Sequence, residues 1–402
     1  MKKMNILMVS DIIFEDEKAG SGRVVTEISK GLQKKGHQVT IITRGRPGLP
    51  EKEENEGRNI VRYPFFSGNL VKTIIAGLFQ TRKMLDSLIY RESFDIVNYN
   101  HPQSSMIVNR IKSISAIPKV YTFFSPWHKE YEVRAKSKGK NGIYSKTNSL
   151  IRKKIERRMI KACEKVIALS NYSIEQLKEY HNIGKAETVL IPGGIDTERF
   201  KPGQDKKLQR KMLGLPEDKK ILFTVRNLEP RMGLDNLIEA LKIVTKKRNN
   251  VLLIIGGAGS LEKKLKQMAS EFSLEQNVKF IGLVNDEQLP LYYQAADYFI
   301  LPTAELEGFG LVTLEALSCG TPVLATDVGA TRELITGSEY LFKSPQPRDL
   351  AIKILEYLDI SEERSKQISN ESRTHVLNNY SWDKAADSYE KVLYEVIGKQ
   401  EK

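Results

Sequence analysis

Two glutamates, Glu307 and Glu315, are the residues of this chain whose type and spacing best suit chemistry. They are the first and last residues of the segment Glu-Gly-Phe-Gly-Leu-Val-Thr-Leu-Glu. The apolar run 298–302 predicts a buried strand before them, and helical spacing from Leu311 predicts a helix start. Glycines let backbone approach a ligand closely, and the free amides of a first helical turn favour an anion such as phosphate. A binding site for a nucleotide-sugar needs this combination: two carboxylates that bind hydroxyls, on either side of a helix start that binds phosphate.

Strand-like apolar runs alternate with helical patterns along the chain. These elements must position Glu307 and Glu315. In the first half the strand-like runs are 6–10, 38–43, 60–64, 96–100, 119–124, 165–170 and 188–192. In the second half they are 221–225, 251–256, 278–282, 298–302, 322–326 and 340–343. Helical patterns such as 22–35 and 69–91 separate them. This alternation predicts an α/β protein with two doubly wound, Rossmann-like domains.

A glycine- and proline-rich segment over 192–203 separates the two series of strands and predicts the domain boundary. We expect a first domain over 1–194 and a second over 195–377, facing each other across a central cleft. Ligands of doubly wound sheets bind at the carboxyl ends of the strands, so each domain would contribute one wall. The last segments, 361–376 and 382–398, read as helices, and we expect the helix within 378–402 to pack back on the first domain.

Composition indicates a globular chain of two domains: it has 402 residues, of which 40% are hydrophobic. No apolar run approaches the roughly 18 residues of a membrane-spanning helix. The amino-terminal apolar stretch is short and meets Asp11 at once, which favours a first strand over a signal peptide. Cys163 and Cys319 lie in apolar helical contexts without metal-ligand spacing and read as free thiols. We expect a cytoplasmic protein.

Positive charge is concentrated in one stretch of the chain, 129–165. It holds thirteen lysines and arginines against four glutamates, out of a formal net charge of +13 for the whole chain. Ile151, Ile155 and Met159 form one apolar stripe there. The simpler interpretation is a helix with a core-facing stripe and a solvated basic face. The alternative is peripheral contact with an anionic membrane, at its inner face, or with a phosphate-bearing acceptor. Nucleic acid is a weaker option, because aromatic residues do not alternate with the basic ones.

Several motifs, in order, resemble those of the family 4 glycosyltransferases, the glycosyltransferase group 1 family of the GT-B fold. They are the loop Gly-Ser-Gly at 20–22, the joint Ile-Pro-Gly-Gly-Ile-Asp at 191–196, the loop Gly-Gly-Ala-Gly-Ser at 256–260, the Glu-x7-Glu segment, and Ala-Leu-Ser-Cys-Gly-Thr-Pro-Val at 316–323. One glycine-rich loop is weak evidence, whereas this order and spacing is specific. The resemblance covers nearly the whole chain.

The resemblance implies roles for individual residues. Glu315 would accept hydrogen bonds from ribose hydroxyls, and Glu307 would contact hydroxyls of the donor sugar. Gly22 would lie near the diphosphate or the acceptor, and Asn227 and Val284 beside the donor. The segment between the two glutamates would face the sugar and diphosphate through Gly308, Phe309, Gly310, Leu311, Val312 and Thr313. No cofactor is implied beyond the nucleotide-sugar donor itself, with a UDP-sugar ahead of a GDP-sugar, and the acceptor would be a hydroxyl of a glycan, lipid or small molecule.

The chain departs from the family pattern at three positions. Relatives commonly carry a histidine in a segment like Thr-Phe-His-Gly-Pro-Trp, where this chain has Phe124, with His128 four residues later. Relatives also carry Gly-Arg-Leu followed by Lys-Gly, where this chain has Asn227 and Met232. Arginines stand one position earlier in each case, at 226 and 231.

These observations lead to two hypotheses from different classes. The first is a retaining, metal-independent glycosyltransferase of polysaccharide or glycolipid synthesis, with Glu307, Arg231 and Arg226 in catalysis. Donors aimed at charge developing on a leaving group contribute on the order of 3 kcal/mol each. No Asp-x-Asp segment stands at a strand end to hold a metal, and no His/Cys metal spacing is evident, so we expect no metal. The second is a catalytically weak or silent nucleotide-binding partner subunit, motivated by the three departures.

Overall fold

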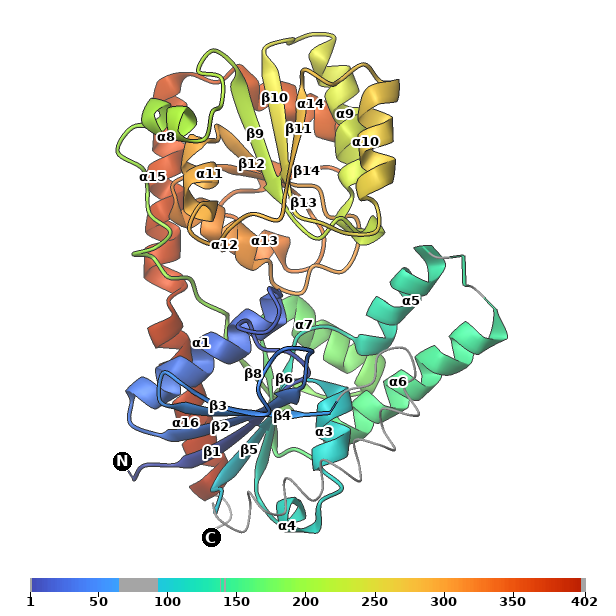
Figure 1. Ribbon diagram of the computed structural model, residues 1–402, viewed down its shortest axis with the longest axis vertical. Helices are drawn as coiled ribbons and strands as arrows, with labels where there is room; N and C mark the ends of the chain where they lie inside the picture. Colours follow the sequence, from blue (N-terminus) through green and yellow to red (C-terminus); the bar gives the residue numbers. More distant parts are fainter. Residues whose placement is uncertain (1, 65–92, 138, 141, 399–402) are drawn as a thin grey trace. The chain divides into compact units, whose positions relative to one another are not determined.

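The structure, a computed structural model, describes residues 2–64, 93–137, 139–140 and 142–398. The chain divides into two compact units, each built on its own sheet (Figure 1). Unit 1 comprises Met1–Gly194 and Trp382–Lys402, and unit 2 comprises Ile195–Ser381. The helix predicted over 69–91 lies outside the described residues. Among the helices that are described, none is both long enough and apolar enough to span a membrane.

Unit 1 contains an eight-stranded sheet in the order β3-β4-β2-β1-β5-β6-β7-β8. The strands are β1 (Asn5–Val9), β2 (Gln38–Arg44), β3 (Lys52–Asn55), β4 (Arg58–Tyr63), β5 (Ile96–Tyr99), β6 (Lys119–Phe123), β7 (Lys165–Ala168) and β8 (Thr188–Leu190). Neighbours run parallel except in the β3–β4 hairpin. The strand order reverses at β1, which lies between β2 and β5. In doubly wound sheets this switch point is where ligands bind.

Helices cover both faces of the unit 1 sheet (Figure 1). They are α1 (Gly20–Lys34), α3 (Pro102–Val108), α4 (Lys112–Ser115), α5 (Trp127–Ser137), α6 (Ile143–Lys161), α7 (Asn171–Gln176), the π-helical turn η1 (Leu177–His181), the short turn η2 (Lys185–Glu187) and α16 (Trp382–Gly398). The last of these returns from unit 2 and packs closely on α1. A Cβ added at Gly31 would lie 2.5 Å from the Cβ of Ala386, so the two helices approach closely there.

Unit 2 contains a six-stranded parallel sheet in the order β11-β10-β9-β12-β13-β14. Its strands are β9 (Lys220–Val225), β10 (Val251–Gly256), β11 (Val278–Gly282), β12 (Tyr298–Leu301), β13 (Val323–Thr326) and β14 (Leu341–Phe342). Its helices are α8 (Lys206–Met212), α9 (Leu234–Thr245), α10 (Glu262–Glu271), α11 (Leu289–Ala295), α12 (Leu311–Ser318), α13 (Thr331–Leu334), α14 (Pro347–Leu358) and α15 (Glu362–Asn379), with the turns η3 (Pro230–Met232) and η4 (Ser338–Tyr340). The sheet has helices on both faces (Figure 1).

The predicted α/β class with two doubly wound domains is confirmed. The apolar runs became strands because parallel strands covered on both faces must be apolar throughout. β3 was not predicted, since its sequence Lys-Glu-Glu-Asn has no apolar alternation. It pairs only with β4 at the edge of the sheet, where charged side chains reach solvent.

Candidate functional site

Glu307 lies in the loop that leaves the carboxyl end of β12 and enters α12. The loop turns through two left-handed residues, Leu306 with φ of 57° and Gly310 with φ of 93°. A neighbouring loop holds Glu307 from the other side: the Ala330 amide donates to the Glu307 carbonyl over 2.8 Å. A Cβ at Gly329 would stand 2.1 Å from that carbonyl oxygen, so only glycine allows the two loops to pack. The backbone therefore fixes Glu307 at a strand end.

The Glu307 carboxylate is the centre of a buried polar network. Its side chain is 9% exposed, and Oε2 accepts hydrogen bonds from Arg226 Nη2 at 2.6 Å and Thr303 Oγ1 at 3.0 Å. Arg226 Nη1 also donates to Thr303 Oγ1 at 2.7 Å, which closes the triangle. Burial by itself would raise the pKa of Glu307, but Arg226, with help from Arg231 and Thr303, lowers it below its usual value. Glu307 is thus a fixed, ionised acceptor.

Arg231 lies beside the same loop and is held mainly through its backbone. Its carbonyl accepts from the amides of Ala304 and Glu305, and its Nη1 donates to the Leu306 carbonyl at 2.9 Å. A guanidinium carries five N–H donors. Within the described residues no carboxylate forms an ion pair with Arg231, so most of its donors remain available to an anion. Glu305, which could rival Glu307 by sequence, is exposed.

Glu315 lies just over one turn into α12 and is buried, with 5% of its surface exposed. Tyr293 of α11 donates its hydroxyl to Glu315 Oε2 over 2.8 Å. Burial and the adjacent carboxylate raise the pKa of Tyr293 well above its usual value, so the phenol remains a donor. The Tyr293 ring packs among Phe200, Phe223 and Phe299. A buried acid needs a partner, and this aromatic cluster holds the partner in place.

Glycines of the 256–260 loop allow close backbone approach to the segment after β9. A Cβ at Gly257, whose φ is +118°, would lie 1.8 Å from the Arg226 carbonyl oxygen. A Cβ at Gly259 would lie 2.5 Å from that of Leu228. Val284 covers the end of β10, since a Cβ at Gly256 would meet its Cγ2 at 2.7 Å. These contacts place Arg226 and Val284 after the ends of β9 and β11, the two strands that flank β10.

The two family positions that hold Asn227 and Met232 have different environments. Asn227 is exposed on the surface of unit 2. Met232 is 4% exposed and belongs to the hydrophobic core with Leu228, Leu234 and Ile238. Met232 therefore points into the core, and the charged neighbour that reaches the Glu307 loop is Arg231.

Gly22 and its neighbours lie at the switch point of unit 1. A Cβ at Gly22 would meet the Ile13 carbonyl carbon at 3.0 Å, so the glycine has a packing reason to be there. The ring of His101, a residue that the sequence reasoning did not single out, lies beside it. Its Nδ1 accepts from the Asp11 amide, which leaves the proton on Nε2, 3.2 Å from Ser21 Oγ. Burial lowers the pKa of His101, which keeps the ring neutral.

Phe124, at the family's histidine position, stacks on His101. The two ring centroids are 5.3 Å apart with an interplanar angle of 28°. An imidazole is therefore present at this strand end, supplied by β5 rather than β6. The signal in the sequence was the polar residue His101 directly after an apolar strand. His128 instead lies buried near Glu156 of α6.

In the α5–α6 hairpin, residues 127–161, the burial of the apolar stripe differs from the simpler interpretation of the basic segment. The predicted apolar stripe faces the core only at its carboxyl end: Met159 is buried, Ile155 is half-buried and Ile151 is exposed. At the start of α6, Ile143 and Tyr144 are 86% and 81% exposed. The helix extends away from the sheet, so its first turns cannot reach the core (Figure 1).

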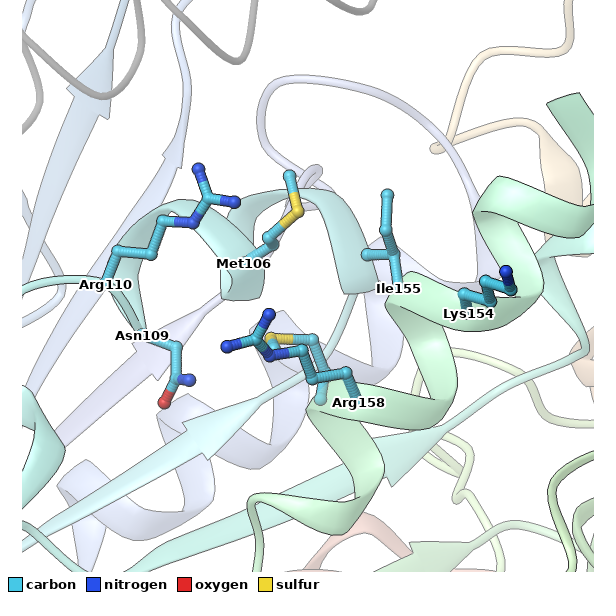
Figure 2. Close-up of a pocket in the computed structure, with 7 residues that line it drawn as sticks. Met106, Asn109, Arg110, Lys154, Ile155 and Arg158 are labelled. Atoms are coloured by element: carbon cyan, nitrogen blue, oxygen red, sulfur yellow. The ribbon is translucent and has the colours of Figure 1, made fainter.

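A basic pocket of about 340 Å³ lies between α3 and α6. Its lining combines cations with apolar side chains: Met106, Asn109, Arg110, Lys154, Ile155, Arg158 and Met159. Figure 2 shows Arg158 extending into the space between the two helices, with Arg110 and Met106 on the α3 side. Such a lining suits a ligand with an anionic group and an apolar part.

Comparison with known proteins gives two family matches along the chain. Residues 205–374 match the family described as Glycosyl transferases group 1, and residues 19–199 match Glycosyltransferase Family 4. An uncharacterized glycosyltransferase of Methanocaldococcus jannaschii is 26% identical over 384 residues, which cover 92% of this chain and 94% of the relative. A D-inositol 3-phosphate glycosyltransferase of Geodermatophilus obscurus is 31% identical over 244 residues, 58% of this chain and 53% of the relative.

Solved structures share the fold over nearly the whole chain. Sucrose-phosphate synthase from Thermosynechococcus elongatus superposes with a TM-score of 0.84 at 21% identity, covering 99% of this chain and 100% of that one. HepE of Anabaena, solved in complex with UDP-glucose, superposes with a TM-score of 0.77 at 20% identity, covering 98% and 100%. At these identities the likeness bears on the fold alone.

Proposed function

Because the chain belongs to the group 1 glycosyltransferases of the GT-B fold, we propose that it moves a sugar from a nucleotide-diphosphate sugar to a hydroxyl acceptor, with retention and without a divalent metal. The observation that carries this proposal is the pair of buried carboxylates, Glu307 and Glu315, fixed at the two ends of one strand-to-helix segment. Both are acceptors with defined partners, and both lie at the carboxyl edge of a parallel sheet, where such folds bind ligands.

Glu315 would bind the ribose and Glu307 the donor sugar. The first-turn amides of α12, between them, suit the diphosphate, although the Thr313 amide already donates to the Gly310 carbonyl over 2.9 Å. A carboxylate whose charge is paired with Arg226 and hydrogen-bonded by Thr303 is a weak nucleophile, because both partners withdraw electron density from it. This favours direct, retaining transfer, in which the departing phosphate takes the acceptor proton. We favour a UDP-sugar as the donor, the class of ligand present in the HepE complex, and keep a GDP-sugar as the alternative because another relative uses GDP-mannose.

The charge that stabilises the leaving diphosphate would come from Arg231. Arg226 is already paired with Glu307, so its main task would be to hold that carboxylate. Arg231 has only one side-chain hydrogen bond within the described residues, to Leu306. Losing one preorganised donor to developing charge costs on the order of 3 kcal/mol, or about 100-fold in kcat.

The stacked ring of His101 favours turnover over the silent alternative. The sequence suggested that an imidazole had been lost at Phe124. The structure has one on the adjacent strand end, hydrogen-bonded near Ser21 and Gly22. We therefore propose that His101 supplies the imidazole on the acceptor side. His101→Ala should lower the transfer rate and leave the affinity for nucleotide, a property of unit 2, unchanged.

The decisive experiment combines binding and hydrolysis. A thermal-shift panel of UDP, GDP, ADP and their sugars would identify the donor, and release of nucleotide from the matching sugar would follow turnover. We expect Glu315→Ala to lose the nucleotide-induced shift, and Arg231→Ala to keep it while losing turnover. Glu305→Ala, an exposed acid of the same loop, is the matched control. Nucleotide binding without any donor cleavage in the wild-type protein would favour the silent partner subunit.

The acceptor would carry an anionic group at a membrane surface. The exposed Ile143 and Tyr144 lie on the same helix as the exposed cations Lys154 and Arg158. An apolar surface beside basic residues is typical of peripheral membrane helices. Co-sedimentation with vesicles containing anionic lipid should fall for Ile143→Ser/Tyr144→Ser and become less salt-sensitive for Lys154→Glu/Arg158→Glu.

The control for the vesicle experiment is Lys246→Glu/Lys247→Glu, which removes two exposed cations from unit 2. If this pair lowers co-sedimentation as much as the α6 pair does, attraction is a matter of net charge, and the α5–α6 hairpin has no special part in it.

A further inference from the structure

Three side chains from three elements of unit 1 meet in a buried cluster: His128 of α5, Glu156 of α6 and His181 of η1. They are 3%, 1% and 0% exposed. One ligand atom from each lies within 4.8 Å of the other two. The residues are far apart in the sequence, with no metal-binding spacing, so only the fold brings them together.

The distances fit one small cation. His181 Nε2 lies 3.1 Å and His128 Nδ1 lies 3.9 Å from the same oxygen, Glu156 Oε2. Zinc binds histidine nitrogen and carboxylate oxygen at about 2.0–2.1 Å in a tetrahedron, which puts neighbouring ligand atoms about 3.3 Å apart. The observed separations lie on either side of that value. Small side-chain rotations would bring all three atoms to one centre.

Three of the four imidazole nitrogens of the cluster lack hydrogen-bond partners among the described residues. Among the described residues, His128 Nδ1 and both ring nitrogens of His181 are buried without one. The contact of 3.1 Å between His181 and Glu156 does not have hydrogen-bond geometry. A metal-free acid–histidine cluster would be expected to use that contact as a hydrogen bond. Buried polar atoms without partners are rare in native proteins and often mark an absent ion or water.

A backbone amide holds the carboxylate of the cluster in place. The Trp127 amide lies 3.1 Å from Oε2 and orients the carboxylate, as outer partners of metal ligands do.

We propose that His128, Glu156 and His181 bind one Zn²⁺ ion, with water in the fourth position. Two imidazoles and one carboxylate are a ligand set that zinc accepts readily. All three belong to unit 1, whereas the residues proposed to bind the donor sugar belong to unit 2. The ion would fasten the α5–α6 hairpin to η1. This role is structural and independent of the transfer reaction.

The test uses the full chain, purified without a histidine tag and freed of metal with a chelator. Addition of Co²⁺ should give an intense visible d–d absorption, typical of four-coordinate cobalt, which Zn²⁺ then abolishes. Elemental analysis after Zn²⁺ loading and dialysis should find about one zinc per chain. Zinc should also raise the thermal midpoint of the wild-type protein. None of these measurements requires a variant that might fail to fold.

Variants then assign the ligands. Glu156→Gln keeps the shape and loses the charge, and His181→Gln removes a ligand. Both should lose the cobalt spectrum and the zinc-dependent thermal shift. His37→Gln is the matched control, because the buried ring of His37 forms another histidine–glutamate pair in unit 1, 2.9 Å from the half-buried Glu390, and no second histidine joins it among the described residues. A six-coordinate cobalt spectrum, no retained zinc, or equal binding by Glu156→Gln would overturn the proposal and leave a metal-free buried cluster.

Discussion

The buried pair of Arg226 and Glu307 gives the sharpest prediction on the donor-side network. Replacing Arg226 by Met removes the guanidinium but keeps the length of the side chain. Glu307→Gln is the matching change on the partner. Each single variant leaves one charged side chain without its ionic partner, in a site where the two side chains are only 6% and 9% exposed. The double variant, Arg226→Met/Glu307→Gln, leaves no charge at all.

The expected magnitudes follow from that burial. Breaking a buried ion pair by removing one partner costs about 3–5 kcal/mol, because the remaining charge is uncompensated. Thr303 still donates to Glu307 in Arg226→Met, so we expect the lower end of that range there. The double variant should cost less than the sum of the two single variants, and the coupling energy should be about 1–3 kcal/mol.

Two measurements give these costs. One is urea unfolding followed by circular dichroism, and the other is hydrogen exchange of peptides from β9 and the 302–310 loop. The exchange data assign the loss to unit 2, since the two units need not unfold together. The coupling should also depend on pH. The folded-state pKa of Glu307 lies below its ordinary value of 4.5, so the coupling is fully present above that value and is lost as the pH falls through the folded pKa. Additive costs at neutral pH, within about 0.5 kcal/mol, would refute the reasoning.

Two further predictions concern residues of unit 2. Met232→Lys, which restores the family's lysine, should not help the enzyme: the side chain lies in the core, and burial that lowers a lysine pKa by about 3 units costs about 4 kcal/mol. Asn227→Arg, at an exposed position, should leave the urea midpoint unchanged, and equal stability of the two variants would contradict the packing described here. Tyr293→Phe removes the hydroxyl that holds Glu315 and should weaken nucleotide binding about 10-fold by calorimetry, worth about 1.4 kcal/mol; unchanged affinity would mean that Glu315 does not bind the ribose.

Much of the fold followed from hydrophobic patterns. Runs such as 251–256 and 298–302 are continuous and apolar, because strands covered on both faces bury every side chain, and they became β10 and β12. The patterns failed where burial is partial. β3 is charged at the sheet edge, and Ile151 has the spacing of a core residue yet lies where α6 has left the core. Spacing within a helix does not reveal how far the helix extends beyond the sheet.

The candidate site was predictable where one segment contains its residues, and less so elsewhere. Glu307 and Glu315 stand in a single motif. Their partners Arg226 and Tyr293 come from the segment after β9 and from α11, and sequence does not give the distance between such elements. Met232 stands where relatives carry a lysine, yet its side chain lies in the core, because alignment records position and ignores side-chain direction. The sequence did not reveal the cluster of His128, Glu156 and His181, because its members lie far apart in the chain and only packing brings them together.

The return of α16 to unit 1 has a consequence for how the protein is made. The ribosome completes the whole of Ile195–Ser381 before it releases Trp382–Gly398, whose buried face includes Tyr389 and Leu393. Unit 2 is continuous in the chain and can fold during synthesis. Unit 1 must wait with the α16-binding side of α1 uncovered until the last helix emerges. Unit 1 is thus synthesised first but completes its fold last. A nascent chain stalled before residue 382 would present an apolar surface to chaperones.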